Sequence, residues 1–311
     1  MAHNSDALPI VVGLGDVDPS SVNPALEGVA RFVREPEAKD LAHAVGAIVR
    51  AHVNVDHGLF EQMPQLKVLA RTGVGTERVD LSEAARRGIP VVITPGSNTT
   101  AVAEGSLAHL LALTKSLSPL TALVREGRWS ERASVTVGDL AGGTLAILGY
   151  GRIGRRVAGL AGAFGMSCLA YDPYVDSADI PLAATLEEAV ATASHITVHL
   201  PATPETAGLI NRELISTFQP GTILVNLARG EVLDLDAALW GLNVGHLGGV
   251  GLDVFDAEPP APHPLFDHPQ VILSPHVMGL TTQSTAETFR QAALGVADVL
   301  SGRKPAHQAA P

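Results

Sequence analysis

Short apolar runs alternate with polar, helix-compatible stretches through the first hundred residues. The apolar runs predict strands over residues 8–13, 45–49, 66–70 and 90–94. The stretches between or beside them predict helices over residues 37–44, 56–63 and 81–87. Strands that are almost continuously apolar and are separated by helices are typical of a parallel sheet covered on both faces. This part of the chain therefore predicts an α/β domain.

A long helical pattern runs from about Thr99 to Arg125, with a kink or break expected at Pro119. A second alternating series follows it. Its apolar runs predict strands over residues 144–148, 167–171, 195–200, 222–226, 247–253 and 271–274. The segments between them predict helices over residues 152–164, 186–192, 212–217 and 235–242. Six strands with crossover helices match a complete dinucleotide-binding sheet. A last helix is expected over residues 285–300, followed by a frayed tail.

Composition narrows the class of protein. The 311 residues are 46% hydrophobic and 17% charged, and the net charge of −11 argues against nucleic acid or an anionic membrane as a partner. No apolar run is long enough to span a bilayer, and residues 1–6 lack the features of a signal peptide. The single cysteine, Cys168, lies in an apolar run and is expected in the core. We expect a cytoplasmic protein. The histidines form no metal-binding cluster, so we expect no metal site.

The glycine-rich segment Gly149-Tyr150-Gly151-Arg152-Ile153-Gly154 lies between a predicted strand and a predicted helix. In a dinucleotide-binding turn the first glycine permits a tight turn, the second admits a pyrophosphate, and the third lets helix and strand pack closely. Asp172 ends the next strand, where a carboxylate accepts hydrogen bonds from ribose hydroxyls and repels a 2′-phosphate. The pattern predicts NAD rather than NADP. An ordinary glycine-rich turn is the alternative.

Three further ionisable residues follow predicted strands, where open α/β sheets bind their ligands. Arg229 offers a planar fork suited to a carboxylate, although a surface ion pair would also account for it. Glu258 and His276 are each unremarkable alone, but together beside a dinucleotide site they indicate proton transfer. Reduction of a 2-keto acid needs a carboxylate clamp, a proton donor and a hydride. These residues supply the first two, with Glu258 favouring a protonated His276.

Six segments in order carry a resemblance to the D-2-hydroxyacid dehydrogenase family, which includes phosphoglycerate, glycerate, hydroxypyruvate and D-lactate dehydrogenases. They are the glycine-rich segment, Tyr171-Asp172-Pro173, residues 199–206, Asn226-Leu227-Ala228-Arg229-Gly230, residues 251–255 and Ser274-Pro275-His276. The resemblance covers nearly the whole chain. It implies two doubly wound parallel-sheet domains, with a Rossmann NAD-binding domain (residues 100–286) inserted into a flavodoxin-like substrate domain (residues 1–99 and 287–311). It also implies a homodimer, with the segment around Trp129 taking part in pairing.

The resemblance assigns roles to individual residues. It implies that Arg229, Glu258 and His276 are catalytic and that Asp253 faces the nicotinamide carboxamide. The remaining residues that it places around the cofactor are Gly149, Tyr150, Gly151, Arg152, Ile153, Gly154, Asp172, Pro173, His199, Leu200, Pro201, Thr206, Leu227, Ala228 and Gly279. Those that it places around the substrate are Arg71, Val74, Gly75, Asn98 and Met278.

Two positions bear on the substrate. Arg71 resembles the arginine by which phosphoglycerate dehydrogenases contact a distal phosphate, which suggests a 2-hydroxy acid with a second anionic group. Pairing with a neighbouring acid such as Glu77 or Glu104 is the alternative. Met278 stands where the family often has a small residue, and it is expected to add bulk near the nicotinamide. The alternative functions are a dehydrogenase specialised for a phosphonate or other oxyanion, and an NAD-sensing binding protein similar to the corepressors built on this scaffold.

Overall fold

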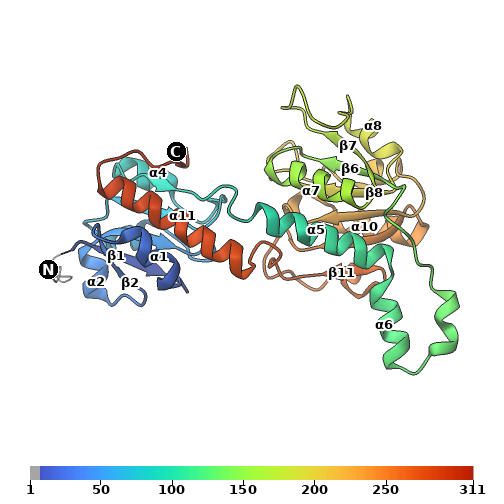
Figure 1. Ribbon diagram of the computed structural model, residues 1–311, viewed down its shortest axis with the longest axis horizontal. Helices are drawn as coiled ribbons and strands as arrows, with labels where there is room; N and C mark the ends of the chain where they lie inside the picture. The colour runs from blue at the N-terminus through green and yellow to red at the C-terminus, as the bar shows by residue number, and fades with distance from the viewer. Residues whose placement is uncertain (1–7, 311) are drawn as a thin grey trace. The chain divides into compact units, whose positions relative to one another are not determined.

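The computed structural model describes residues 8–310, and the chain divides into two compact units (Figure 1). The first unit runs to Asn98 and resumes at Leu280, and the second spans Thr99–Gly279. The prediction placed the second boundary after residue 286. The difference arises because helix α11 (Thr282–Leu300) begins earlier than its apolar pattern does, with the Thr281 hydroxyl accepting from the Ser284 backbone N–H. Residues 280–286 thus belong to the first unit.

The first unit holds a five-stranded parallel sheet in the order β2-β1-β3-β4-β5. Its strands are β1 (Ile10–Leu14), β2 (Arg31–Val33), β3 (Ala44–Val49), β4 (Val68–Arg71) and β5 (Val91–Val92). This is the flavodoxin-like order, in which the chain reverses direction across the sheet beside β1. The predicted α/β domain is confirmed, and the prediction missed only β2, whose three residues are too short for a pattern.

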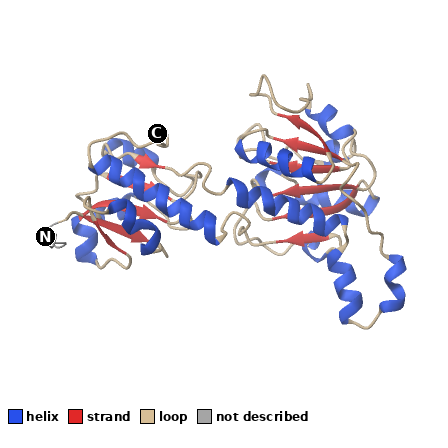
Figure 2. Ribbon diagram, in the orientation of Figure 1, coloured by secondary structure: helices blue, strands red, loops and turns tan. Residues whose placement is uncertain are grey.

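Helices cover both faces of this sheet (Figure 2). Helices α1 (Pro19–Leu26) and α11 share one apolar core with one face of the strands. The other face packs against α2 (Ala38–His43), α3 (His57–Gln62) and α4 (Leu81–Arg86). The prediction missed α1 because prolines at positions 19 and 24 and polar residues between them obscure its period. Its first turn nevertheless has Asp18 as N-cap and a proline at N1, where the missing N–H costs nothing.

The chain after α11 is ordered against the sheet, so the predicted frayed tail was wrong. Gln308 pairs antiparallel with Val92, the Ala309 backbone N–H donates to the Val91 carbonyl at 2.8 Å, and Pro305 is buried. Strand β5 is the edge of the sheet, and an edge presents unpaired backbone groups that favour an added strand. The tail therefore caps this edge.

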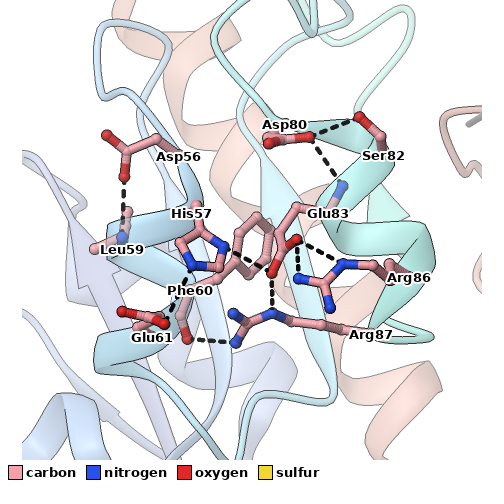
Figure 3. A network of polar contacts seen from close by, with 10 residues as sticks. All are labelled: Asp56, His57, Leu59, Phe60, Glu61, Asp80, Ser82, Glu83, Arg86 and Arg87. Atoms are coloured by element: carbon pink, nitrogen blue, oxygen red, sulfur yellow. Dashed lines mark hydrogen bonds and ion pairs between the residues drawn. The ribbon is translucent and has the colours of Figure 1, made fainter.

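A polar network joins α3 to α4 around the Glu83 carboxylate (Figure 3). The side chain is 7% exposed and accepts hydrogen bonds from Arg86, from Arg87 Nε at 2.5 Å and from His57 at 3.2 Å. Hydrogen bonds from Arg86 and Arg87 lower the pKa of Glu83 to about 2. The carboxylate is thus stabilised in its charged form in the folded protein.

We expect Glu83→Gln to lower the Tm by about 2–4 °C at neutral pH. The pKa of Glu83 is lower in the folded chain than its ordinary 4.5. Its stabilising contribution is therefore fully present above pH 4.5 and is lost as the pH falls toward 2. Thermal unfolding of both proteins between pH 7 and pH 2.5 checks this, and the gap in Tm should close as the pH falls. A gap independent of pH, or an equal loss in the exposed-acid control Glu213→Gln, would contradict the prediction.

The second unit holds a six-stranded parallel sheet in the order β11-β10-β9-β8-β6-β7. Its strands are β6 (Thr144–Leu148), β7 (Ser167–Tyr171), β8 (His195–Val198), β9 (Thr222–Asn226), β10 (Leu247–Leu252) and β11 (Val271–Leu273). A parallel bridge between Ala170 and Leu182 adds one more rung outside β7. That rung completes the strand order of a dinucleotide-binding sheet, whose switch point lies beside β6.

Helices again cover both faces of the second sheet (Figure 2). One face packs against α5 (Thr99–Thr114) and α7 (Arg152–Ala163). The other packs against α8 (Leu186–Ala191), α9 (Arg212–Ile215) and α10 (Leu235–Val244). The six predicted strands and their helices agree with the structure to within about three residues at each end.

The long helix predicted from Thr99 breaks at Ser116, which has φ +50°, and continues as α6 (Leu117–Arg125). Pro119 lies in the first turn of α6, where a residue without an N–H is tolerated. A 3₁₀ helix, η2 (Trp129–Ser134), follows, and the α6–η2 segment extends away from the sheet of its own unit (Figure 1). Within the described residues no single helix could cross a membrane; only the bent pair of α5 and α6 meets the length and composition test.

Candidate functional site

The turn between β6 and α7 has the geometry that its glycines predict. A Cβ on Gly149, at φ +96°, would lie 2.6 Å from the His199 carbonyl oxygen, and one on Gly154 would lie 2.2 Å from the Gly149 oxygen. Around Gly151, in contrast, nothing lies within 4 Å of such a Cβ. Gly151 is also the N-cap of α7, so its open side is next to the first N–H groups of that helix. The turn therefore has room for a phosphate where a dinucleotide requires it.

Tyr150 turns its ring away from this open side and buries it completely in the core beneath α7. Its backbone N–H donates to Asp172 at 2.8 Å, and its hydroxyl donates to Asp179 at 2.5 Å. The Arg155 guanidinium stacks 4.5 Å from the ring centre. Burial, followed by the bond to Asp179, raises the pKa of Tyr150 to about 12. Only the backbone of this residue remains to face a ligand.

Asp172 follows β7 directly and lies at the entrance of the same turn. Its two carboxylate oxygens accept from the backbone N–H groups of Tyr150 at 2.8 Å and Tyr174 at 3.0 Å. These bonds fix the carboxylate at the strand end, where the resemblance places a ribose. Pro173, the next residue, is exposed. Arg152 and Ile153 form the first turn of α7, Arg152 exposed and Ile153 packed against the core.

The segment after β8 carries an orphaned polar atom. His199 Nε2 lies 3.0 Å from the Thr197 hydroxyl, whereas the buried Nδ1 has no hydrogen-bond partner within residues 8–310. Burial lowers the pKa of His199 to about 3, so the ring is neutral at physiological pH. Leu200 is buried, and the Thr206 hydroxyl donates to the exposed Pro201 carbonyl at 2.6 Å and closes this loop. An unsatisfied nitrogen beside the glycine-rich turn fits a bound polar ligand.

Arg229 lies three residues beyond the end of β9, in a turn built by Asn226. The Asn226 side chain donates to the Arg229 carbonyl at 2.8 Å and accepts from the Ala228 backbone N–H at 3.0 Å. Arg229 donates from Nη1 to the Ala228 carbonyl at 2.8 Å. A Cβ on Gly230 would lie only 2.0 Å from the Phe255 carbonyl carbon. The Arg229 turn is thus pressed against the backbone that follows β10.

Glu258 and His276 meet as the sequence predicts. His276 Nδ1 lies 2.7 and 2.9 Å from the two Glu258 oxygens, and the Phe255 backbone N–H also donates to Glu258. A carboxylate only accepts, so Nδ1 carries the proton and Nε2 is the nitrogen presented outward. His276 has φ +53°, a left-handed conformation that is unusual for a non-glycine residue and is found at functional sites.

Asp253 follows β10 and is 2% exposed. It accepts from the Ser274 hydroxyl at 2.6 Å and from the backbone N–H groups of Val277 and Met278 at 2.9 and 3.1 Å. The Met278 side chain packs against Gly105 and Leu227 in the core of the second unit. Leu227 is buried, while Ala228 and Gly279 are half-buried. The carboxylate therefore holds the backbone immediately after His276.

A pocket of about 380 Å³ opens at these strand ends. Its lining includes Glu258 and His276 together with the apolar side chains of Phe255 and Leu273. Because β9, β10 and β11 are parallel neighbours, the residues that follow them gather at one edge of the sheet. The second unit by itself thus contains the Glu258–His276 pair, the Arg229 turn and the glycine-rich turn.

The predicted substrate residues other than Met278 lie in the first unit. Arg71 ends β4, is 6% exposed, and donates to the carbonyls of Thr72 and, at 3.2 Å, Ala51. The next residues form a loop in which the Gly73 backbone N–H donates to the Thr94 hydroxyl at 2.8 Å. In this loop Val74 is 52% exposed and Gly75 is half-buried. Asn98 is half-buried at the end of the unit.

Sequence reasoning missed His109, which lies on α5 and contacts Ser274. Its only signal was a histidine within a helix face that is otherwise apolar. It also missed the structural roles of Asn226 and Asp179, because a side chain that shapes a turn leaves no periodic pattern.

Comparison with known proteins agrees with this geometry. Residues 107–278, more than half of the chain, match the family model of the D-isomer specific 2-hydroxyacid dehydrogenase, NAD binding domain. The chain is 39% identical over 302 residues to the D-3-phosphoglycerate dehydrogenase of Mycobacterium bovis, covering 94% of this chain but 56% of that protein. The chain thus spans about half the length of the curated relatives it matches.

Solved structures extend the match over nearly the full chain. A protein of Thermus thermophilus is 34% identical with a TM-score of 0.86, covering 97% of this chain and 100% of that one. The D-lactate dehydrogenase of Aquifex aeolicus, solved with NAD and lactic acid, is 29% identical with a TM-score of 0.78, covering 94% and 96%. On the family match and this agreement, the chain belongs to the D-isomer specific 2-hydroxyacid dehydrogenase family.

Proposed function

We propose that this protein is an NAD-dependent oxidoreductase that interconverts a D-2-hydroxy acid and its 2-keto acid. The observation that carries the proposal is the Glu258–His276 pair, at the same sheet edge as the Arg229 turn and Asp253. The family match supports the NAD-binding part, and the D configuration follows from the family. Each side chain of the site then has a distinct task.

His276 moves the proton. Its Nδ1 is held by Glu258, so Nε2 donates to the carbonyl oxygen of a 2-keto acid, or takes the hydroxyl proton in the opposite direction. Glu258 stabilises the imidazolium that forms and fixes the plane of the ring. Proton transfer by a positioned group is worth about 10²–10⁴ in rate.

Arg229 binds the acid. Its guanidinium is a planar fork that pairs with a carboxylate and polarises the adjacent carbonyl. The Asn226 side chain and the close approach of Gly230 to the Phe255 backbone fix the turn that presents it.

The cofactor residues fit a dinucleotide. The open side of Gly151 and the first N–H groups of α7 would hold the pyrophosphate, Asp172 would accept from the ribose, and His199 Nδ1 would gain the partner that it lacks within residues 8–310. When bound, the nicotinamide supplies or accepts the hydride at the carbon that bears the oxygen. The chain's own contribution is to bind, to orient and to move the proton.

The test is a panel of 2-keto acids with NADH, followed by the loss of NADH absorbance. Turnover of at least one of them, dependent on Glu258 and His276, is the expected result. NADH binding with no turnover on any keto acid would overturn the oxidoreductase and favour a binding protein that senses NAD.

Replacing Asp172 with serine should narrow the preference for NADH over NADPH by about 10- to 100-fold. The carboxylate repels the 2′-phosphate of NADPH and accepts hydrogen bonds from the ribose of NADH. Hydrogen bonds to a charged group are worth about 1.5–3 kcal/mol, which corresponds to a change in affinity of about 10- to 100-fold. Fluorescence titration of both cofactors measures it. Asp176→Ser, at an exposed acid of the same loop, is the control. An unchanged ratio would mean that another group selects the cofactor.

We propose further that the substrate carries a second anionic group. A relative at 39% identity is named for a substrate that bears a phosphate as well as a carboxylate, and Arg71 is a buried cation next to the candidate substrate loop. Its carbonyl contacts with Thr72 and Ala51 orient the guanidinium, whose planar and permanently charged fork is suited to an oxyanion.

Arg71→Ala should lower kcat/KM for 3-phosphoglycerate at least about tenfold more than for D-lactate, because only the former has the distal charge. Steady-state kinetics on both substrates measure this difference, and Arg78→Ala, at an exposed arginine of the same unit, is the control. An equal loss on both substrates would leave Arg71 a purely structural role in binding the carbonyls of Thr72 and Ala51.

We also propose a cytoplasmic homodimer. The α6–η2 segment carries apolar side chains that are 52–63% exposed, namely Leu117, Val124 and Trp129, and a surface of this kind favours pairing. A single cysteine and a net charge of −11 suit a reducing compartment without nucleic acid as partner. Light scattering should give twice the chain mass of 32.2 kDa.

A further inference from the structure

A buried chain of hydrogen bonds connects helix α5 to the loop that carries His276. His109 on α5, Ser274 after β11 and Asp253 after β10 are 4%, 8% and 2% exposed. His109 Nδ1 lies 2.9 Å from the Gly105 carbonyl, and its Nε2 lies 3.3 Å from the Ser274 hydroxyl. That hydroxyl lies 2.6 Å from Asp253 Oδ1. None of these contacts belongs to the proton transfer assigned to His276.

The hydrogens available to these hydrogen bonds indicate the charge of the His109 ring. The Gly105 carbonyl only accepts, so His109 Nδ1 carries a hydrogen. The Asp253 carboxylate also only accepts, and the one hydroxyl hydrogen of Ser274 is directed to it over the shorter contact. His109 Nε2 must then carry a hydrogen as well. With both ring nitrogens donating, the ring would be an imidazolium, bridged to the Asp253 carboxylate by Ser274.

Asp253 connects these hydrogen bonds to the backbone of the loop after His276. Besides Ser274, it accepts from the N–H groups of Val277 and Met278, the two residues directly after His276. His276 itself has φ +53°, a conformation that persists only where the surroundings enforce it. The bonds to Val277 and Met278 are part of that enforcement, and a charged His109 would compensate the buried carboxylate that accepts them.

The same turn of α5 also holds the loop by packing. A Cβ on Gly105 would lie 2.7 Å from Met278 Cβ, so the absence of a side chain there lets the methionine pack against the helix. Gly105 thus makes room for Met278 and supplies the carbonyl that binds His109. Helix α5 therefore anchors the loop through one apolar and one polar contact.

We propose that His109 is a positioning residue for the reaction, a buried cation that acts through Ser274 and Asp253 to hold His276 in place. The proposal rests on the proposed function, because it assumes that His276 moves the proton. The ordinary alternative for such a histidine is a neutral core residue that only fills space. The charge of the His109 ring and the effect of its replacement on kcat distinguish the two roles.

The test begins with His109→Leu, which keeps the buried volume and removes the charge and both hydrogen bonds. We expect kcat to fall about 10- to 100-fold, as small misplacements of catalytic groups do, with KM for the keto acid changed less than about threefold. His109→Gln, which restores one N–H donor toward Ser274, should recover part of the loss. Ser274→Ala should reproduce it, and the double variant should be no worse than Ser274→Ala alone.

His195→Leu is the matched control. His195 is a second buried histidine of the same unit, bonded to Thr114 and Ser194 and to none of the site residues. Its replacement should lower the Tm with little change in kcat. An equal loss of kcat in the His195 and His109 variants would mean that any buried defect disturbs the site and would overturn the proposal.

Nitrogen-15 NMR of the His109 ring at neutral pH supplies a readout that does not depend on turnover. Two protonated ring nitrogens, and amide signals of Val277 and Met278 that shift in His109→Leu, are expected. A ring with one proton, or unshifted amides, would overturn the proposal even in an active enzyme. If the wild type turns over no keto acid, the proposed function fails, while the spectrum still decides whether His109 is a cation that holds the loop.

Discussion

Replacing His276 with alanine should lower kcat by about 10²–10⁴-fold while the Kd for NADH changes less than about threefold. In the proposed function the ring is the group that moves the proton, and Glu258 holds it through Nδ1. The glycine-rich turn that would bind the phosphates lies after β6, away from this loop in the chain, so cofactor binding should persist. Stopped-flow single-turnover rates and fluorescence titration separate the two effects.

The left-handed backbone at His276 calls for a second variant. Alanine adopts φ +53° reluctantly, whereas asparagine tolerates that region, so His276→Asn tests the loss of the proton donor without the loss of the loop. Both variants should be similarly slow. His263→Ala, which removes another histidine paired with a carboxylate, Asp236 at 3.3 Å, is the control and should retain kcat. Normal turnover by His276→Asn would remove His276 from the reaction.

Adding one methyl group at Gly230 should also inactivate the protein. A Cβ there would lie 2.0 Å from the Phe255 carbonyl carbon and 2.2 Å from the Asp256 nitrogen, and neither of these backbone atoms is at the end of a flexible side chain. Gly230→Ala must therefore separate the Arg229 turn from the segment that leads to Glu258. We expect a loss of about 1–3 kcal/mol in the free energy of unfolding and about a 10²-fold fall in kcat/KM.

Gly162→Ala is the matched control for that substitution. Gly162 lies on α7, where nothing is within 4 Å of an added Cβ, and alanine is the better helix former. Its stability should be unchanged or slightly higher, with normal kcat/KM. Calorimetry and steady-state kinetics on the two variants give the comparison. A fully active Gly230→Ala would show that the two loops can move apart without cost to the site.

Much of the fold could be predicted because its strands are buried on both sides. A short apolar run such as residues 222–226 is expected in the buried centre of a parallel sheet, and β9 spans the same residues. Elements whose formation depends on a partner were missed. Strand β2 has three residues, the rung at Leu182 needs the edge at Ala170, and the tail at Gln308 needs the edge at Val92. The residues around Leu182 and Gln308 carry no local pattern that shows the strand edge with which they pair.

The candidate site also has features that could be predicted from the sequence and features that could not. Glu258 and His276 could be paired from the sequence because both follow parallel strands, whose ends lie at one edge. The burial of the Tyr150 ring and the packing of Met278 against Gly105 could not, because each depends on the side-chain volume opposite it. His109 escaped notice because its partner Ser274 lies 165 residues further along the chain.

The contact between Gly105 and Met278 brings together the two ends of the second unit, since one lies six residues after its start and the other one residue before its last. A domain whose termini are neighbours can be exchanged as a block between hosts, because the host's chain has only a short gap to bridge. Residues 99–279 are therefore a portable module. Evolution could change the first unit while this module, with the Glu258–His276 pair and the glycine-rich turn, passed on intact.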